Sequence, residues 1–185
     1  MKETLEQIFL RHAVHDMDAG HADKGSTHSY IPVYETLLAP YREAGSILEL
    51  GLAQGWSLAM WGEYFGKTAR ISGADISVVF DTAKFQEPRF HILEADATKP
   101  EFLNKLGNRT FDIILDDASH MIADQAASFR LLKSRVNPGG LYIIEDILSL
   151  ESSLPTLRGL HPHCEILDRR HVKGRWDDVL VVYRF

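Results

Sequence analysis

Short β-rich runs alternate with helical patterns along this chain from position 47 onward. Parallel strands need a crossover connection between them, usually a helix, so this alternation is typical of an α/β fold with a parallel sheet. The candidate strands are Ile47–Leu50, Arg70–Ile76, Phe90–Ala95, Phe111–Asp116 and Gly140–Glu145. The helical patterns between them cover Ser57–Phe65, Val78–Phe85, Lys99–Leu106 and about Ile122–Val136.

The chain changes character after the fifth candidate strand. Asn137-Pro138-Gly139-Gly140 is expected to end the last helical pattern, because proline cannot continue a helix and glycine accepts positive φ. Two further β-rich runs, Cys164–Arg169 and Val179–Phe185, leave no room for a crossover helix and should pair antiparallel. We therefore predict a Rossmann-like α/β sheet of five parallel strands plus a C-terminal antiparallel hairpin, with helices on both faces.

The composition is that of a globular protein with one hydrophobic core. At 185 residues the chain fits a single domain, 1–185, with a helical segment at 1–45 and the Rossmann-like core at 46–185. The net charge of -6 argues against a nucleic-acid partner, which would need clustered Lys and Arg. The lone Cys164 fits a reducing compartment, and no apolar stretch approaches membrane-spanning length, so we expect a cytoplasmic protein without membrane contact.

The first candidate strand ends in a small-residue turn, Gly51 to Gly55, and the second ends at Asp75. Glycines let backbone approach a ligand, and a carboxylate at the next strand end can bind both hydroxyls of a ribose, so the pattern indicates a nucleoside-containing cofactor. The turn lacks the three glycines of a dinucleotide site, and Glu49 before it suits a cationic amino-acid moiety better than a diphosphate. These features, with the terminal hairpin, favour S-adenosylmethionine over NAD(P).

Two strands end in paired carboxylates, Asp116-Asp117 and Glu145-Asp146. Strand four should lie between strands one and five, so these ends become neighbours about 4.8 Å apart. Carboxylates at that spacing can share one divalent cation such as Mg²⁺ or Mn²⁺, whereas without an ion they would repel one another. A competing interpretation is that one of the four acids caps the helix that follows.

His120 stands three residues beyond Asp117 in the same loop. Its ordinary pKa of about 6.5 makes it a competent base near neutrality. Histidines at such junctions are more often caps or surface residues, but the offset from Asp117 favours a role beside the metal. We predict that His120 is the general base of the site.

Several motifs together resemble one known family over nearly the whole chain. They are Asp23-Lys24-Gly25-Ser26, His28, Tyr30, Tyr34, Ile47-Leu48-Glu49-Leu50-Gly51, Gly55-Trp56-Ser57-Leu58, Met60-Trp61, Asp116-Asp117-Ala118-Ser119-His120, Pro138-Gly139-Gly140 and Ile144-Glu145-Asp146. The set resembles the metal-dependent sugar O-methyltransferases of macrolide biosynthesis, the mycinamicin and demethylmacrocin type, within the class I S-adenosylmethionine-dependent methyltransferases. The order of the acids is similar, more distantly, to that of catechol O-methyltransferase.

The resemblance assigns roles to individual residues. It implies a Mg²⁺ site, an S-adenosylmethionine site and a catalytic base, His120. The implied metal ligands are Asp117, Glu145 and Asp146. The implied cofactor residues are Glu49, Gly51, Ser57 and Asp75, with Asp96 near the adenine, and Lys24 and Tyr30 in the 1–45 segment folded over the site. We place Asp116 in the cofactor site, as a supporting neighbour rather than a metal ligand.

The chain also departs from the family pattern. Ala118 replaces the usual glycine, and Ala97 stands where a glutamine often follows the Asp96 position. The macrolide enzymes carry a long N-terminal auxiliary domain and insertions that shape a large pocket, and neither is expected here. The macrolide substrate therefore does not carry over.

These observations predict a Mg²⁺-dependent O-methyltransferase. Its acceptor would be a hydroxyl of a small sugar, polyol or catechol-like molecule. Two alternatives remain: an S-adenosylmethionine-binding protein without metal-dependent catalysis and, less favoured, a nicotinamide oxidoreductase. The sequence leaves the acceptor's identity and a homo-oligomeric state open.

Overall fold

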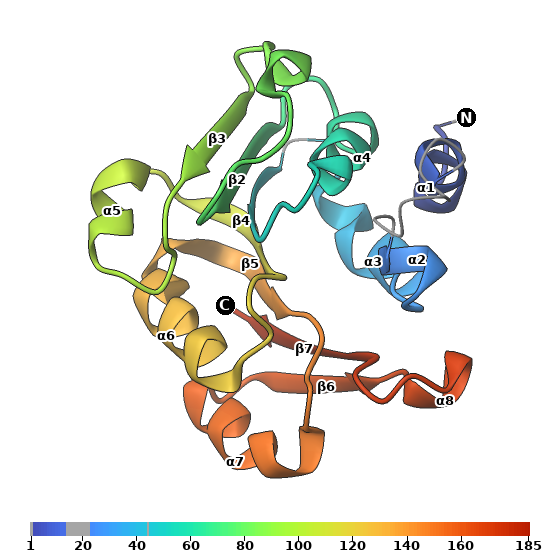
Figure 1. Cartoon of the computed structure of the whole chain (residues 1–185), viewed down its shortest axis with the longest axis vertical. Coiled ribbons are helices and arrows are strands. Elements are labelled where there is room, and N and C mark those ends of the chain that lie inside the picture. Colours follow the sequence, from blue (N-terminus) through green and yellow to red (C-terminus); the bar gives the residue numbers. More distant parts are fainter. Residues whose placement is uncertain (1, 14–22, 44) are drawn as a thin grey trace.

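The computed structural model describes residues 2–13, 23–43 and 45–185 of the chain. Its centre is a seven-stranded sheet with the strand order β3-β2-β1-β4-β5-β7-β6 (Figure 1). The strands are β1 (Ser46–Leu50), β2 (Arg70–Asp75), β3 (Phe90–Glu94), β4 (Phe111–Asp116), β5 (Val136–Ile144), β6 (Cys164–Asp168) and β7 (Val179–Arg184). β1 to β5 run parallel, and β7 pairs antiparallel with both β5 and β6. The predicted five parallel strands and terminal antiparallel hairpin are confirmed.

Helices cover both faces of this sheet (Figure 1). On one face lie α1 (Leu5–Ala13), α3 (Ile31–Leu38) and α4 (Trp56–Tyr64). On the other lie α5 (Glu101–Leu106), α6 (Ile122–Leu132) and α7 (Leu150–Leu160). The remaining short elements are α2 (Asp23–Ser26), α8 (Arg170–Lys173) and the 3-10 turns at Ala39–Tyr41, Thr82–Phe85 and Lys133–Arg135.

Side-chain alternation along the strands builds a separate apolar layer on each face. On β1, Ile47 belongs to the layer with α1, α3 and α4, whereas Leu48 and Leu50 belong to the layer with α5, α6 and α7. Both faces are buried, which explains why the central strands read as nearly continuous apolar runs. In the described part of the chain, no helix has both the length and the apolar character needed to cross a bilayer.

Two sequence predictions about helices are corrected by the structure, and one helix was not predicted. The pattern predicted as helix to Val136 ends at Leu132, and the following Asn137–Gly140 lies inside β5. The two glycines there form backbone hydrogen bonds with Phe185, of the kind that joins neighbouring strands. Gly139 N donates to Phe185 O at 2.8 Å, and Phe185 N donates to Gly140 O at 3.1 Å. The pattern at Val78–Phe85 is reduced to a 3-10 turn over Thr82–Phe85, and α7 was not predicted at all.

The strand order places the predicted site residues along one edge of the sheet. β4 pairs with β1 on one side and β5 on the other, as the sequence predicts. The backbone bonds continue past the strand ends, with Asp117 N donating to Leu50 O and Glu145 N to Asp116 O, both at 2.9 Å. The carboxylates after β4 and β5 therefore lie beside the turn after β1.

Candidate active site

The turn between β1 and α4 requires glycine at its first position. Gly51 has φ +84°, and a Cβ built on it would lie 2.0 Å from the backbone oxygen of Asp117. The turn is held from β2, because Leu52 N donates to the Asp75 carboxylate at 2.7 Å. A second oxygen of Asp75 accepts from Ser77 N at 3.0 Å, so this acid also orders the segment that follows β2.

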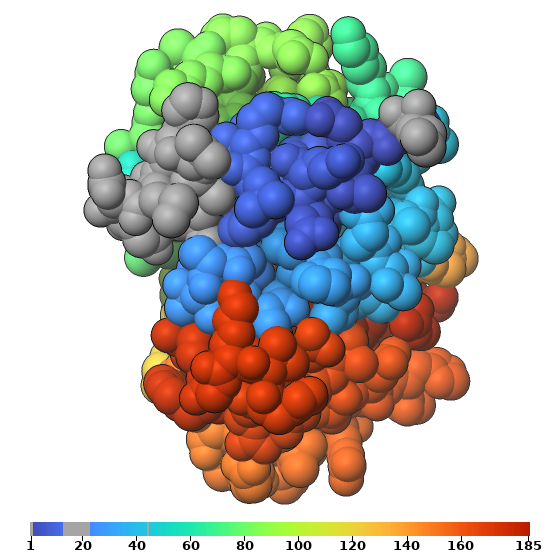
Figure 2. Space-filling view, turned by 90° about the vertical axis from the view of Figure 1, so that its right-hand side faces the viewer, coloured from blue at the N-terminus to red at the C-terminus, as the bar shows by residue number. Residues whose placement is uncertain are grey.

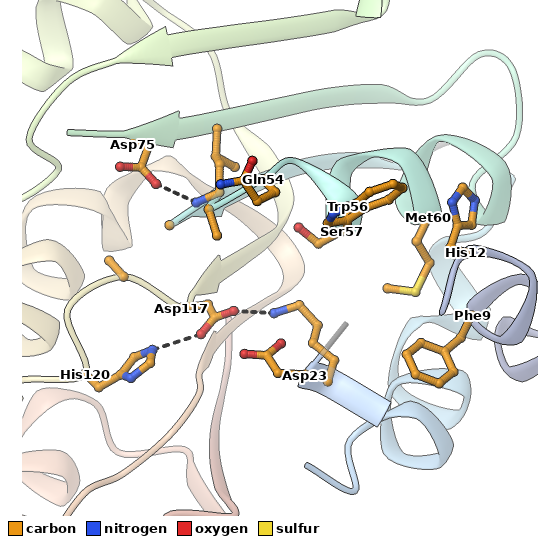
Figure 3. Close-up of a pocket in the computed structure, with 15 residues that line it drawn as sticks. Phe9, His12, Asp23, Gln54, Trp56, Ser57, Met60, Asp75, Asp117 and His120 are labelled. Carbon is orange, nitrogen blue, oxygen red and sulfur yellow. Dashed lines mark hydrogen bonds and ion pairs between the residues drawn. The ribbon is translucent and has the colours of Figure 1, made fainter. Parts of the chain in front are cut away.

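Two adjoining cavities of about 310 Å³ each open on either side of this turn. Both are lined by Gly51, Asp75 and Ala118. The first is also lined by Lys24, Ser57, Asp117 and His120, and Figure 3 shows the last three of these side chains around it. The second contains Asp96 and Asp116. An elongated ligand with Asp75 near its middle would reach into both cavities.

Glu49 lies behind the first cavity with its side chain buried. One carboxylate oxygen accepts from Ser57 Oγ at 2.6 Å, and the other has no hydrogen-bond partner, with Lys24 Nζ at 3.4 Å. Burial raises the pKa of Glu49 above its ordinary value. A buried carboxylate oxygen without a hydrogen bond fits an added cationic or N–H donor nearby, such as the amino group of an amino-acid moiety.

Lys24 joins the turn to the acids after β4 and β5. Its ammonium donates to Asp117 at 2.5 Å and to Glu145 at 2.7 Å, and its side chain is 6% exposed. Burial alone would lower the pKa of Lys24, but the surrounding carboxylates raise it well above its ordinary value. The same ammonium holds the pKa of Asp117 down despite burial, whereas burial and the Asp117 charge raise the pKa of Glu145.

Asp117, His120 and Asp146 converge on one point. One side-chain ligand atom from each lies within 4.8 Å of the other two. His120 Nε2 is 3.0 Å from Asp117 Oδ1 and 3.7 Å from Asp146 Oδ2, and the first of these contacts is dashed in Figure 3. The hydrogen bond to Asp117 raises the pKa of His120. Two carboxylates and one imidazole at this spacing form a donor set that a divalent cation can occupy.

Three aromatic residues of the N-terminal segment contact these acids. Tyr30 OH donates to Asp146 Oδ1 at 2.6 Å, and Tyr34 OH donates to Glu145 Oε1 at 2.6 Å. The His28 ring stacks on Tyr30, with Nδ1 3.3 Å from Asp146 Oδ1. Tyr30 therefore contacts a predicted metal ligand, and it does not line either of the two cavities.

The C-terminal hairpin holds the same segment in place. Asp178 accepts hydrogen bonds from both Ser29 N and Ser29 Oγ, and Lys173 Nζ donates to backbone oxygens of 25, 26 and 28. In Figure 2 the lighter-blue part of the N-terminal segment lies directly against the red C-terminal elements. Sequence reasoning assigned no role to His28, Tyr34 or Asp178, although His28 and Tyr34 stand in the motif series.

Backbone strain concentrates in this region. Among the described residues, three non-glycines have positive φ: Ala53 at 43°, His120 at 58° and Asp146 at 54°. Ala53 lies in the turn between β1 and α4, and His120 and Asp146 belong to the group that they form with Asp117, called the acid cluster below. Positive φ costs a non-glycine residue roughly 1 kcal/mol or more, and such strain clusters at functional sites. The strained backbone at His120 and Asp146 thus directs their side chains toward Asp117.

The two remaining predicted cofactor residues line the second cavity. The Asp96 carboxylate accepts from Thr98 N at 2.9 Å and Thr98 Oγ1 at 2.6 Å, and these bonds lower its pKa. Asp116 is buried and accepts from Tyr142 OH at 3.1 Å, on the sheet face opposite Lys24. Asp116 is therefore separated from the acid cluster although it adjoins Asp117 in sequence.

Burial raises the pKa of Asp116 to about 7, which predicts a pH dependence of folding in metal-free protein. A raised carboxyl pKa stabilises the fold fully below the unfolded-state value of 3.8, and this stabilisation is lost as the pH rises through about 7. The loss is roughly 4 kcal/mol at most, since one pKa unit corresponds to 1.36 kcal/mol. Asp116→Asn should therefore lose less stability than the wild type between pH 4 and pH 8 in urea unfolding with EDTA. Equal losses in both proteins would contradict this role for Asp116.

Comparison with known proteins places this geometry in context. No protein-family model matches the chain. It is 36% identical over 167 residues to the 8-demethyl-8-alpha-L-rhamnosyl tetracenomycin-C 2'-O-methyltransferase of Streptomyces olivaceus, covering 85% of the chain and 40% of that protein. It is 35% identical over 133 residues to the mycinamicin VI 2''-O-methyltransferase of Micromonospora griseorubida, covering 66% of the chain and 32% of that protein. The chain thus spans two fifths or less of these relatives' length.

A solved structure matches the whole chain. It is the MycE methyltransferase from the mycinamycin biosynthetic pathway, in complex with Mg and SAH. The TM-score is 0.74 at 25% identity, covering 100% of this chain and 55% of that one. The strand order of the sheet and the turn after β1 fit the fold of these relatives. The chain therefore has the fold of the class I S-adenosylmethionine-dependent methyltransferases and is similar in sequence to the sugar O-methyltransferases of the mycinamicin type.

Proposed function

We propose that this chain transfers a methyl group from S-adenosylmethionine to a hydroxyl of a small sugar, polyol or catechol-like acceptor, with Mg²⁺ or Mn²⁺ bound beside the acceptor. The convergence of Asp117, His120 and Asp146 at the edge of the first cavity carries the proposal. A base and a divalent-cation donor set adjoin the turn that would hold the methyl donor. The activities of the related proteins support methyl transfer to oxygen as the reaction class.

The two adjoining cavities suit S-adenosylmethionine. We place its adenine in the second cavity near Asp96, with Asp116 as a supporting neighbour, and its ribose at Asp75. Its amino-acid part would lie toward Ser57 and Glu49, and the Glu49 oxygen that has no hydrogen bond could accept from the amino group beside Lys24. Gly51 lets the backbone turn between the two cavities. MycE was solved with SAH, and this likeness supports the assignment.

The metal would be held by Asp117, Glu145 and Asp146. Oxygen donors are those that Mg²⁺ prefers, so the carboxylates fit it better than the His120 ring does. Asp117 and Asp146 already face the shared point, whereas Glu145 bonds to Lys24 and Tyr34. The chemistry supplied by a bound Mg²⁺ is charge stabilisation of a hydroxyl as it loses its proton.

His120 is then the base that takes this proton. Its Nε2 faces the acids, and the ring is about one third exposed, so an acceptor can reach it. Asp117 holds the ring by a hydrogen bond and stabilises the imidazolium that forms. A bound S-adenosylmethionine would supply its methyl group to the acceptor oxygen and leave as the thioether, and His120 would hold the proton of the acceptor.

The 1–45 segment would close this site from one side. Within its described part, Phe9, His12, Asp23 and Lys24 line the first cavity. Tyr30 and Lys24 reach the acids, so we infer that they position the metal ligands more directly than they contact the methyl donor. The positions 14–22 lie outside the described residues.

Binding measurements followed by a transfer assay test the proposal. Titration calorimetry should show SAH binding and a divalent-ion site that EDTA removes, and NADPH should not bind. Methyl transfer from labelled S-adenosylmethionine to a panel of sugars, polyols and catechols should then require Mg²⁺ or Mn²⁺. SAH binding without a divalent-ion site would favour the alternative of a methyl-donor binder without metal-dependent catalysis. Undiminished transfer in excess EDTA would likewise overturn the metal's role.

A further inference from the structure

A cavity of about 580 Å³ lies at the amino ends of the strands, the edge of the sheet opposite the site above. Its lining includes three arginines and one histidine, Arg70, Arg89, Arg109 and His91, and no carboxylate residue. The whole chain carries a net charge of -6, so this local excess of positive charge does not follow from composition. No residue lining this cavity lines either of the two cavities described above.

The floor of the cavity is polar where a parallel sheet is normally apolar. Ser46 on β1 pairs in register with Arg70 on β2, and Ser72 pairs with His91 on β3. By strand alternation, Ser46 and Ser72 share the face of Leu48 and of the helix α5. The helix α5 ends at Leu106, and this residue and the loop that follows it line the cavity. Larger apolar side chains at 72 and 91 would have filled the space.

Several nitrogens around the cavity have unused hydrogen-bonding capacity. His91 Nε2 and Arg89 Nη1 are buried and have no hydrogen-bond partner. Arg109 donates from Nη1 to Leu106 O, and among the described residues neither Arg109 nor Arg70 pairs with a carboxylate. Arg89 is already engaged elsewhere, because its Nε donates to Glu87 and its Nη2 donates to the backbone oxygen of Gly62 on α4. Buried nitrogens without partners are costly, so an acceptor-rich ligand would remove a penalty.

We propose that this cavity binds a small molecule that carries a phosphate group. Guanidinium groups match phosphate oxygens through paired N–H donors, and Arg70 and Arg109 approach the cavity from β2 and from the loop after α5. The volume falls within the range of small-molecule sites, so it leaves room for an organic body beside the phosphate. Burial and the Arg109 charge lower the pKa of His91, which agrees with a positive field at the cavity floor.

The imidazole signals of His91 report on occupancy directly. The isotope-labelled chain of 185 residues is titrated with inorganic phosphate, glucose 6-phosphate and ADP, and with glucose and adenosine as phosphate-free counterparts. We expect saturable shifts of the His91 signals for at least one phosphate carrier, with a Kd below about 1 mM, and none for the counterparts. The pair Arg70→Gln/Arg109→Gln should weaken that binding by about tenfold or more.

The control pair Arg130→Gln/Arg158→Gln removes the same net charge from exposed positions on α6 and α7. It should bind the same probe within about twofold of the wild type, and thermal unfolding checks that all variants fold. Equal weakening by both pairs would show general attraction of anions instead of a site. Absence of saturation by any probe up to about 10 mM would also overturn the proposal. Binding of inorganic phosphate alone would limit the ligand to the free ion and reject the organic body.

Discussion

Asp117→Asn is expected to lower methyl transfer by roughly 100-fold or more, because the charge stabilisation supplied by a metal is worth several kcal/mol. Asparagine keeps the size of the side chain but removes the charge that faces both Lys24 and His120. It also removes one carboxylate from the converging donor set. We therefore expect the affinity for Mg²⁺ to fall together with turnover, while SAH affinity changes little. Calorimetry with Mg²⁺ and with SAH, beside a labelled-methyl assay, measures all three quantities.

Asp168→Asn is the matched control for that substitution. It makes the same chemical change on β6, where Asp168 is exposed and pairs with Arg170 away from the candidate site. Its turnover and Mg²⁺ affinity should equal those of the wild type. Should Asp117→Asn retain wild-type Mg²⁺ affinity, the metal must be held without this residue and the assigned ligand set is wrong.

Lys24→Met is expected to cost about 3–5 kcal/mol of unfolding free energy in metal-free protein near pH 7, since it leaves buried carboxylates without their cation. Asp117, Glu145 and Glu49 all lie within 3.4 Å of the Lys24 ammonium. Methionine keeps most of the apolar length, so the loss of packing is small. Added Mg²⁺ should stabilise the variant more than the wild type, because a bound cation relieves the larger repulsion. Urea unfolding with EDTA and with Mg²⁺ measures both effects.

Lys133→Met provides the comparison, because Lys133 is exposed in the turn after α6. Surface substitutions of this kind usually change stability by less than about 0.5 kcal/mol. A loss for Lys24→Met as small as this would mean that the carboxylates are neutral or solvated in the folded protein. Equal stabilisation of variant and wild type by Mg²⁺ would mean that lysine and metal act on different groups.

The sheet could be predicted from the sequence because its strands are buried on both faces. Runs such as Ile113-Ile114-Leu115 then read without alternation, and the carboxylates that follow them mark the strand ends. The helix α7 escaped prediction because Pro155 lies inside it and interrupts the helical pattern. The strand at Asn137–Gly140 escaped because proline and glycine suggest a turn, whereas here the glycines pair with Phe185 far along the chain.

The candidate site also contains residues whose positions could be predicted from the sequence and contacts that could not. Residues placed by strand ends, such as Asp75, Asp117 and Asp146, lie where the strand order puts them. The contacts of Lys24 with Glu145 and of Ser29 with Asp178 could not be predicted, because they join positions 121 and 149 residues apart. No local pattern encodes such distances, and motif resemblance named Lys24 without indicating which groups it touches. Its buried position among three carboxylates became visible only in three dimensions.

The hydrogen bonds between Ser29 and Asp178 bear on when the candidate site can form during synthesis. During synthesis, the segment carrying Lys24 leaves the ribosome early, while its anchor on the hairpin follows some 149 residues later. At about 5–20 residues per second, this gap leaves the N-terminal segment without its anchor on the hairpin for roughly 7 to 30 seconds. Loop closure over so long a separation is slow and comes late in folding. Occupancy of the site should therefore be among the last events in the maturation of the chain, after the sheet itself has formed.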